Sequence, residues 1–431
     1  MSRRSFDSAT VFSSACDILH SQADQIVMLR NRPDDRELAL LAACLCPLTL
    51  PDRTAGIARI AALPFDADRL VDLAHRHRVS GFVEEGLKAI GYTLPDAAAA
   101  LLARRAAASR MQSLRNAGEE IRVGQALAAA GIDALFVKGS TLAMHAHRTL
   151  MLKTSWDVDV LVARDRLDAA CETLTALGYR LSILGGITDP VHIRRYLAAH
   201  KESEWYHDER GTVVELHTEL GDNRAAITTI GLDSPRMPVE LMPGTSLATL
   251  APAPLFAYLV FHGAKHLWAR LKWLADVAAL LHDADVETLY RKAVALGAGR
   301  CPGLAIVLAH DMFGIAVPHA LLEEIHRDRV TRRLVRFCYT AIVAEEDAEG
   351  RLMRPMRELI AFERAQLWLV PGLAYRWGAV RSLLGRPNAV THLQVPNWAV
   401  PAAILTGLPL RLLRRPARLR PQRAGEPAKP L

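Results

Sequence analysis

The apolar positions of this chain divide it into two long helical blocks with a strand-rich stretch between them. From about residue 36 to 128, apolar residues recur at intervals of three and four, as in RLVDLAHRHRVSGFVEEGLKAI, which is typical of amphipathic helices. The same spacing returns from Leu255 to about 384, beginning with LFAYLVFHGAKHLWARLKWLADVAALL. Between the blocks the pattern changes to short apolar or alternating runs, which predict strands.

Three strands separated by helices are expected in the central stretch. IDALFVKG and VDVLV predict two of them, and TVVELH at 212–217 predicts the third. Residues 140–150, which follow Gly139, predict a helix, and DRLDAACETLTALGY predicts another that ends at Gly178. Five prolines make 231–254 a predicted linker to the second helical block.

These elements predict an α+β chain in which a small mixed-sheet core is flanked by N- and C-terminal helical domains. A chain of 431 residues is long enough for more than one domain. The expected segments are a loose start at 1–35, a helical domain at 36–128, the core at 129–230, the linker at 231–254, a second helical domain at 255–390 and an apolar, basic tail at 391–431.

Acidic side chains interrupt two of the predicted strands. Side chains alternate across a strand, so Asp157 and Asp159 share one face while Val158 and Val160 share the other. Paired carboxylates are hard oxygen ligands suited to Mg²⁺, and without a cation their mutual repulsion is costly. Glu215 in the third strand is the natural third carboxylate, either as a metal ligand or as the acceptor of a proton from an attacking hydroxyl.

A glycine-serine turn follows the first predicted strand. Gly139 permits a close approach of the backbone to phosphate, and the helix that opens at Ser140 presents free N–H groups to an anion. Lys138 and Lys153 flank the turn and are candidates to neutralise phosphate charge. Each motif alone also fits a plain turn or a surface face. Their order along the chain favours one site for a metal and a nucleotide.

This order of motifs resembles the nucleotidyltransferase (polymerase-beta-like) superfamily. It is most similar to the bacterial family of uncharacterised nucleotidyltransferases, over roughly residues 36–285. The stretches that carry the resemblance are DRLVDLAHRHRVSGFV (68–83), LFVKGSTLA (135–143), WDVDVLV (156–162), VVELHTEL (213–220) and HGAKHLWARLKWLADVAALL (262–281).

The resemblance implies the fold and a site for a nucleotide with Mg²⁺, or Mn²⁺ as the alternative. The expected reaction is the transfer of a nucleoside monophosphate from an NTP to an unknown acceptor, either a small molecule or a protein or peptide. Two departures from the family pattern stand out, since KTSW (153–156) replaces an Arg-Gly pair and Glu215 replaces an Asp. They motivate the alternative of a catalytically degenerate protein that binds a nucleotide or a partner.

The start of the second helical block carries two histidines one turn apart. His262 and His266 have a spacing that suits zinc, but no general-base Glu lies between them, which disfavours a metalloprotease-like site. We expect this helix to line the nucleotide site, with Lys265 or a histidine close to phosphate. A packed helix with satisfied histidines is the simpler alternative.

The net charge of +7 is concentrated at one end of the chain. Seven basic residues and one acid lie between 411 and 431, so the body is close to neutral and no nucleic-acid partner is expected. The tail is apolar and then basic, which suits weak contact with an anionic membrane surface or, alternatively, a disordered solubilising end. Scattered cysteines, no secretory signal and no apolar run of about 20 residues favour the cytoplasm. No pattern indicates an oligomeric state.

Overall fold

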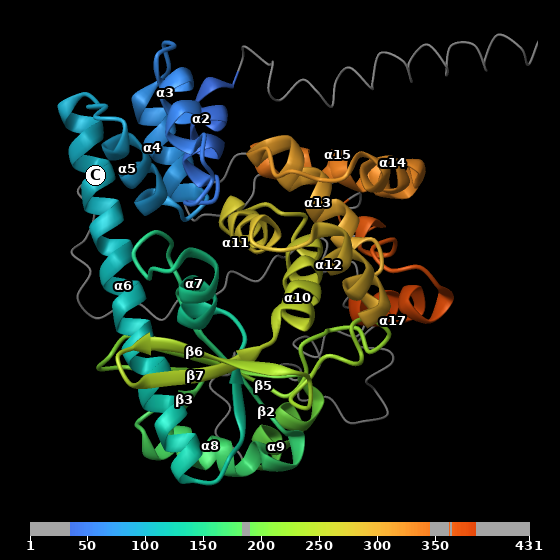
Figure 1. The fold of residues 1–431 in the computed structure, drawn as a ribbon. Coiled ribbons are helices and arrows are strands. Elements are labelled where there is room, and N and C mark those ends of the chain that lie inside the picture. The colour runs from blue at the N-terminus through green and yellow to red at the C-terminus, as the bar shows by residue number, and fades with distance from the viewer. Residues whose placement is uncertain (1–34, 183–189, 345–361, 363, 385–431) are drawn as a thin grey trace, which may run out of the picture.

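The computed structural model describes residues 35–182, 190–344, 362 and 364–384 of the protein. The N-terminal region consists of helices, as the apolar spacing predicts. Their bounds are α2 Arg36–Leu45, α3 Arg53–Ala61, α4 Ala67–Arg76, α5 Ser80–Ala89 and α6 Asp96–Ala129. The side chain of Asp35 caps α2 and that of Asp66 caps α4. Figure 1 shows α6 running from the other N-terminal helices down to the sheet.

A five-stranded mixed sheet forms the centre of the structure, in the order β1-β2-β5-β4-β3. The strands are β1 Ala134–Phe136, β2 Val158–Val162, β3 Arg180–Leu181, β4 Glu202–His207 and β5 Thr212–His217. Strands β2 and β5 are parallel neighbours, and the other pairs are antiparallel. The helices between them are α7 Gly139–His147, η2 Arg164–Arg166, α8 Leu167–Ala176 and α9 Pro190–Ala199. The α+β fold class predicted from the sequence is therefore confirmed.

The stretch 231–254, which its prolines predict to be a linker, contains a hairpin instead. Strands β6 Arg236–Met242 and β7 Thr245–Leu250 form a second, antiparallel sheet that packs against α7 and β1. Its buried residues Val239, Leu241 and Leu247 alternate with more exposed ones. Most of the prolines lie outside the strands, and a two-stranded sheet tolerates proline on its free edges, so the prolines hide the strand pattern.

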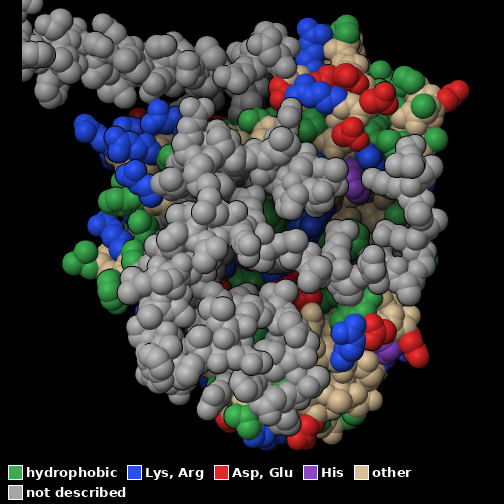
Figure 2. All heavy atoms as spheres, turned by 180° about the vertical axis from the view of Figure 1, so that it is seen from behind, with side chains coloured by type: hydrophobic (Ala, Val, Ile, Leu, Met, Phe, Trp, Pro, Cys, Tyr) green, Lys and Arg blue, Asp and Glu red, His purple; other side chains and the backbone are tan. Residues whose placement is uncertain are grey.

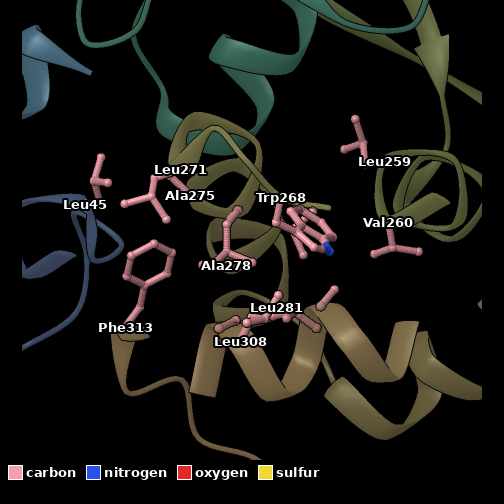
Figure 3. Packing of buried hydrophobic residues seen from close by; sticks show 14 of the residues in the cluster. Leu45, Leu259, Val260, Trp268, Leu271, Ala275, Ala278, Leu281, Leu308 and Phe313 are labelled. Carbon is pink, nitrogen blue, oxygen red and sulfur yellow. The ribbon is translucent and has the colours of Figure 1, made fainter. Parts of the chain in front are cut away.

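The C-terminal helices share a hydrophobic core with the N-terminal ones. They are α10 Pro252–Lys265, α11 Leu271–His282, α12 Val286–Ala293, the π-helical turn η3 Val294–Ala298, α13 Cys301–Phe313, α14 His319–Arg327, α15 Arg329–Val343 and α17 Leu373–Leu384. Leu45 of α2 belongs to the same buried cluster as Ala275 of α11 and Phe313 of α13 (Figure 3). A second cluster fills the face of the sheet that carries Val158 and Val214. The two helical regions are thus held to each other on one side of the sheet.

Charges on the surface are largely balanced by their neighbours. On the face seen from behind, acidic and basic side chains lie next to each other at several places outside the grey residues (Figure 2). Exposed ion pairs such as Arg180–Asp208 and Arg291–Glu324 follow the same rule. None of the helices in the described ranges is both long enough and apolar enough to cross a membrane. The predicted tail at 391–431 lies outside the described residues.

Candidate active site

The parallel pairing of β2 with β5 places two acidic residues side by side. Asp159 is the register partner of Glu215, and both point away from the core that receives Val158 and Val214. Strong alternation in both strands fixes this arrangement, because a shift by one residue would bury the acids in the apolar cluster. The shared face predicted for Asp159 and Glu215 therefore comes from two separate strands.

A histidine joins these carboxylates. His217 follows Glu215 by two residues on β5 and so shares its face. Nε2 of His217 lies 3.1 Å from Oδ1 of Asp159 and 3.6 Å from Oε2 of Glu215. One ligand atom from each of the three residues lies within 4.8 Å of the others, and this group is the only such metal-ligand cluster in the described part of the chain. We call these three residues the acid cluster.

Lys138 is the counter-charge of the acid cluster. Its Nζ lies 2.6 Å from Oδ1 of Asp159, with the lysine side chain 17% exposed and the aspartate side chain 2% exposed. Burial opposes ionisation of both groups, yet their attraction holds the pKa of Lys138 well above its usual value and the pKa of Asp159 below its own. Asp159 is therefore a carboxylate at neutral pH, as a metal ligand must be.

The other two members of the acid cluster have raised pKa values. Burial and the negative charges of Asp159 and Asp157 raise the pKa of Glu215, although His217 opposes this effect. Burial favours neutral His217, but its hydrogen bonds to Asp159 and Glu215 raise the imidazole pKa above its usual value. Nδ1 of His217 has no hydrogen-bond partner among the described residues. Oε2 of Glu202 lies 3.4 Å from this Nδ1 atom, outside hydrogen-bonding geometry.

The first carboxylate of the D-x-D pair stands apart from the acid cluster. Asp157 directly precedes β2, is half-buried, and is not one of the three residues whose ligand atoms converge. Its charge still acts on Glu215, Lys138 and Lys272, so it borders the same site.

Lys153 pairs with a carboxylate that is not part of the acid cluster. Its Nζ donates to both carboxylate oxygens of Asp276 on α11 at 2.7 Å, and Nε2 of His147 lies 2.8 Å from Oδ1 of the same aspartate. All three side chains are buried. The sequence marks Lys153 as a candidate for phosphate, but in the structure it is part of a buried ion-pair group that ties α7 to α11.

The lysine of α10 has a carboxylate partner as well. Lys265 pairs with Asp222, and Lys201 lies 3.1 Å from the same aspartate and also pairs with Glu202. Glu202 in turn lies 3.4 Å from Nδ1 of His217. Lys265 is therefore linked to the acid cluster through Asp222, Lys201 and Glu202.

Sequence reasoning missed one basic residue near Asp157. Lys272 lies in the first turn of α11, where Nζ donates to the backbone carbonyl of Thr154 at 3.3 Å. Burial, with the nearby charge of Arg78, lowers the pKa of Lys272 to about 7. The basic spacing around this helix was visible in the sequence, but nothing in it distinguished Lys272 from Lys153.

The two histidines of α10 pack against an aromatic side chain. The ring centres of His262 and His266 lie 4.9 Å apart, and His266 stacks on Trp273 at 5.1 Å. Burial, together with the charge of Lys138, holds the pKa of His262 well below its usual value. The two rings are thus packed against each other and against Trp273, which is the arrangement of the simpler alternative for these histidines.

The glycine-serine turn is backed by a buried carboxyl group from α6. Oε1 of Glu120 accepts a hydrogen bond from the backbone N–H of Ser140 at 2.8 Å. Gly139 has φ +69°, and a side chain there would collide with the same Glu120 oxygen. Ser140 is itself buried. The first N–H group of the turn, predicted as a phosphate donor, is thus already satisfied from within the protein.

We expect Glu120→Gln to remove a pH dependence of stability. Burial raises the pKa of Glu120 from 4.5 to about 8, and the charge of Asp159 adds to this. Between pH 4.5 and about pH 8, Glu120 keeps its proton in the folded state and loses it in the unfolded state. The free energy of unfolding should therefore fall as pH rises through this window, by up to about 1.4 kcal/mol per pH unit. Urea unfolding of both proteins from pH 5 to 8 measures the slope.

Glu119 provides the control for this prediction on the same helix. It pairs with Arg122 and Arg210, and although burial opposes this, its partners lower its pKa. Its contribution to stability is present above the usual glutamate pKa, so Glu119→Gln should destabilise the protein at neutral pH. An unchanged slope in Glu120→Gln would contradict the prediction.

A family model described as uncharacterised nucleotidyltransferase matches residues 64–314, more than half of the chain. The chain belongs to this family. The match covers the central sheet, the acid cluster and helices α10 to α12, so the resemblance noted from five short stretches is confirmed over a continuous range. No curated protein matches the chain.

Within a nucleotidyltransferase, the donor chemistry of the acid cluster fits a divalent ion. Two carboxylates supply hard oxygen ligands that suit Mg²⁺ and Mn²⁺, and an imidazole is a further ligand for transition metals. Asp159 is ionised and buried, and the ligand atoms of Asp159, Glu215 and His217 already converge.

Proposed function

We propose that the protein is a metal-dependent nucleotidyltransferase that moves a nucleoside monophosphate from an NTP to an acceptor and releases pyrophosphate. The observation that carries the proposal is the register pairing of Asp159 with Glu215 on neighbouring strands of a chain that belongs to this family. The acceptor group is a hydroxyl, an amine or a phosphate on a small molecule, protein or peptide.

Asp159 and Glu215, with Asp157 at their border, are the proposed ligands of Mg²⁺ or Mn²⁺. The ion supplies Lewis-acid stabilisation of the phosphoryl oxygens. Asp159 is the most deeply buried of these carboxylates, and its lowered pKa keeps it ionised, so it is suited to remain a ligand throughout the reaction. His217 holds Asp159 and Glu215 at a fixed separation through its Nε2 atom.

As the alternative to metal ligation, Glu215 is the proposed acceptor of the proton from the attacking group. Its side chain is 26% exposed, so it reaches outward from the buried Asp159. The raised pKa of Glu215 favours its acceptance of a proton. In the reaction, the acceptor oxygen or nitrogen forms a bond to the α-phosphorus, the bond from that phosphorus to the bridging oxygen breaks, and the electron pair leaves with pyrophosphate.

Cationic side chains around the acid cluster are the proposed partners of the triphosphate. Lys138 and Lys265 border the cluster from two elements, and Lys272 approaches from the side of Asp157. Gly139 and Ser140 set the path of the backbone that carries Lys138. We propose no phosphate contact for Lys153, because its ammonium is buried against both oxygens of Asp276, which is not part of the acid cluster.

The position of the radiolabel in the NTP distinguishes this reaction from its alternatives. With cell lysate as the source of acceptor and Mg²⁺ or Mn²⁺ present, label at the α-phosphorus should enter a new product, whereas γ-label should appear in pyrophosphate. Each of the four NTPs is tested in turn. Transfer of the γ-label would instead indicate a kinase. Nucleotide binding without turnover would favour the degenerate, ligand-binding alternative.

A further inference from the structure

Lys138 occupies the place that a cation bound to Asp159 would need. Its ammonium lies 2.6 Å from Oδ1 of Asp159, and His217 donates to the same oxygen at 3.1 Å. An ammonium at this separation neutralises the carboxylate and repels a divalent ion that approaches it. In a buried site this repulsion is weakly screened by salt.

We propose that Lys138 is an internal counter-ion that holds Asp159 in the free protein and moves to the triphosphate when metal and nucleotide bind together. This inference rests on the proposed function. It makes Lys138 a positioning residue with two partners in succession, first a carboxylate of the protein and then an oxygen of the substrate.

The local structure allows the ammonium to move while the backbone stays in place. Ser140 donates its N–H to Glu120, and Thr141 Oγ1 lies 3.0 Å from the carbonyl oxygen of Lys138, so the turn is held on both sides of Gly139. The flexible four-carbon stem of lysine is then the mobile part. Because the side chain is 17% exposed, it is not sealed in the core.

The exchange couples the binding of metal to the binding of nucleotide. Metal alone must displace the ammonium without offering it a new partner, whereas a metal–nucleotide complex brings phosphate oxygens that accept it. Each ligand should therefore raise the affinity for the other, as linkage requires. The free protein would hold its carboxylates ready without retaining a metal ion.

The test measures Mn²⁺ affinity in the absence of nucleotide, from the electron paramagnetic resonance signal of the free ion. Lys138→Met in the full chain should bind Mn²⁺ at least about tenfold more tightly than wild type, because the variant lacks the ammonium that competes with the ion for Asp159. A positive charge beside a carboxylate shifts its proton-binding equilibrium by roughly one to three powers of ten, and we expect an effect of similar size on metal binding. Lys138→Arg keeps the positive charge and should remain weak. The wild-type affinity should rise when a non-hydrolysable NTP is added.

Lys201→Met is the matched control for this experiment. Lys201 carries the same charge near the cluster, but it pairs with Glu202 and Asp222 instead of Asp159. Removing Lys201 takes away one positive charge near the cluster but leaves Lys138 paired with Oδ1 of Asp159. We therefore expect the Mn²⁺ affinity to change by no more than about threefold, because the charge is partly screened. An equal gain in Lys138→Met and Lys201→Met would overturn the inference.

The possible results separate this inference from the proposed function. If wild type binds Mn²⁺ with NTP but Lys138→Met gains no affinity, the counter-ion role is wrong and the nucleotidyltransferase proposal stands. If wild type binds no Mn²⁺ even with NTP, both are wrong. Should Lys138→Met fail to fold, acetylation of wild type by acetic anhydride replaces it. Mn²⁺ without nucleotide, at a concentration high enough to occupy the site, should then displace the ammonium and increase the labelling of Lys138 seen by mass spectrometry. Unchanged labelling at that occupancy would refute the exchange.

Discussion

Replacing Asp159 by asparagine is expected to lower kcat/KM for nucleotidyl transfer by about a thousandfold or more. Loss of a ligand removes several kcal/mol of transition-state stabilisation by the metal, and about 4 kcal/mol corresponds to this factor. Asparagine has nearly the same shape and still accepts a hydrogen bond from His217, so the buried position remains filled. It does not neutralise Lys138, which pairs with Asp159 at 2.6 Å.

The same substitution at a surface aspartate controls for non-specific effects. Asp285 caps α12 by accepting the backbone N–H of Thr288, and asparagine is an equally good capping residue. Asp285→Asn should leave kcat/KM within about twofold of wild type, because surface changes of this kind usually cost within about 0.5 kcal/mol. Retention of more than a tenth of the activity in Asp159→Asn would contradict the proposed role, provided that thermal unfolding shows the variant to be folded.

The face of each strand on which the acids lie follows from local pattern, whereas the pairing of the strands and several contacts of the site do not. Alternation in VDVLV and TVVELH is enough to place Asp159 and Glu215 on one side of each strand, and it also places His217 beside Glu215. The role of His217 depends on its distance to Asp159, which is set by the parallel register of two segments more than fifty residues apart.

The contact between Glu120 and Ser140 is not predicted by any sequence motif. It lies in the middle of a long helix with mixed polarity, where a glutamate is an ordinary helix former. Only the crossing of α6 behind the turn brings its carboxyl to Ser140.

The prediction that Lys153 contacts phosphate also depends on contacts between distant segments. Lys153 follows the predicted helix and precedes the acids, so its sequence position suits phosphate. Its partner Asp276 is 123 residues away, and only the docking of α11 on α7 reveals that the ammonium is occupied. Position along the chain therefore predicts which elements form the site better than it predicts where a long, flexible side chain ends.

Replacing Asp276 by asparagine is expected to lower the free energy of unfolding by about 3–5 kcal/mol, as is typical when one partner of a buried ion pair is removed. Lys153 donates to both oxygens of Asp276, and His147 contacts one of them. Burial opposes ionisation of the aspartate, but these two partners hold its pKa below the usual value. Its contribution is thus present at neutral pH and is lost only as the pH falls through the lowered pKa.

The loss of stability in Asp276→Asn should come from the unpaired charge of Lys153 rather than from a change in side-chain shape. In Asp276→Asn the ammonium of Lys153 stays buried without a carboxylate, so adding Lys153→Met should recover most of the lost stability. Glu324→Gln, which breaks an exposed pair with Arg291, should cost no more than about 1 kcal/mol. Urea unfolding at pH 7 gives the free energies of unfolding of Asp276→Asn, Lys153→Met, the double variant and Glu324→Gln. Additive losses in Asp276→Asn and Lys153→Met would show that the pair does not act as a unit, and the link between α7 and α11 would then rest on apolar packing.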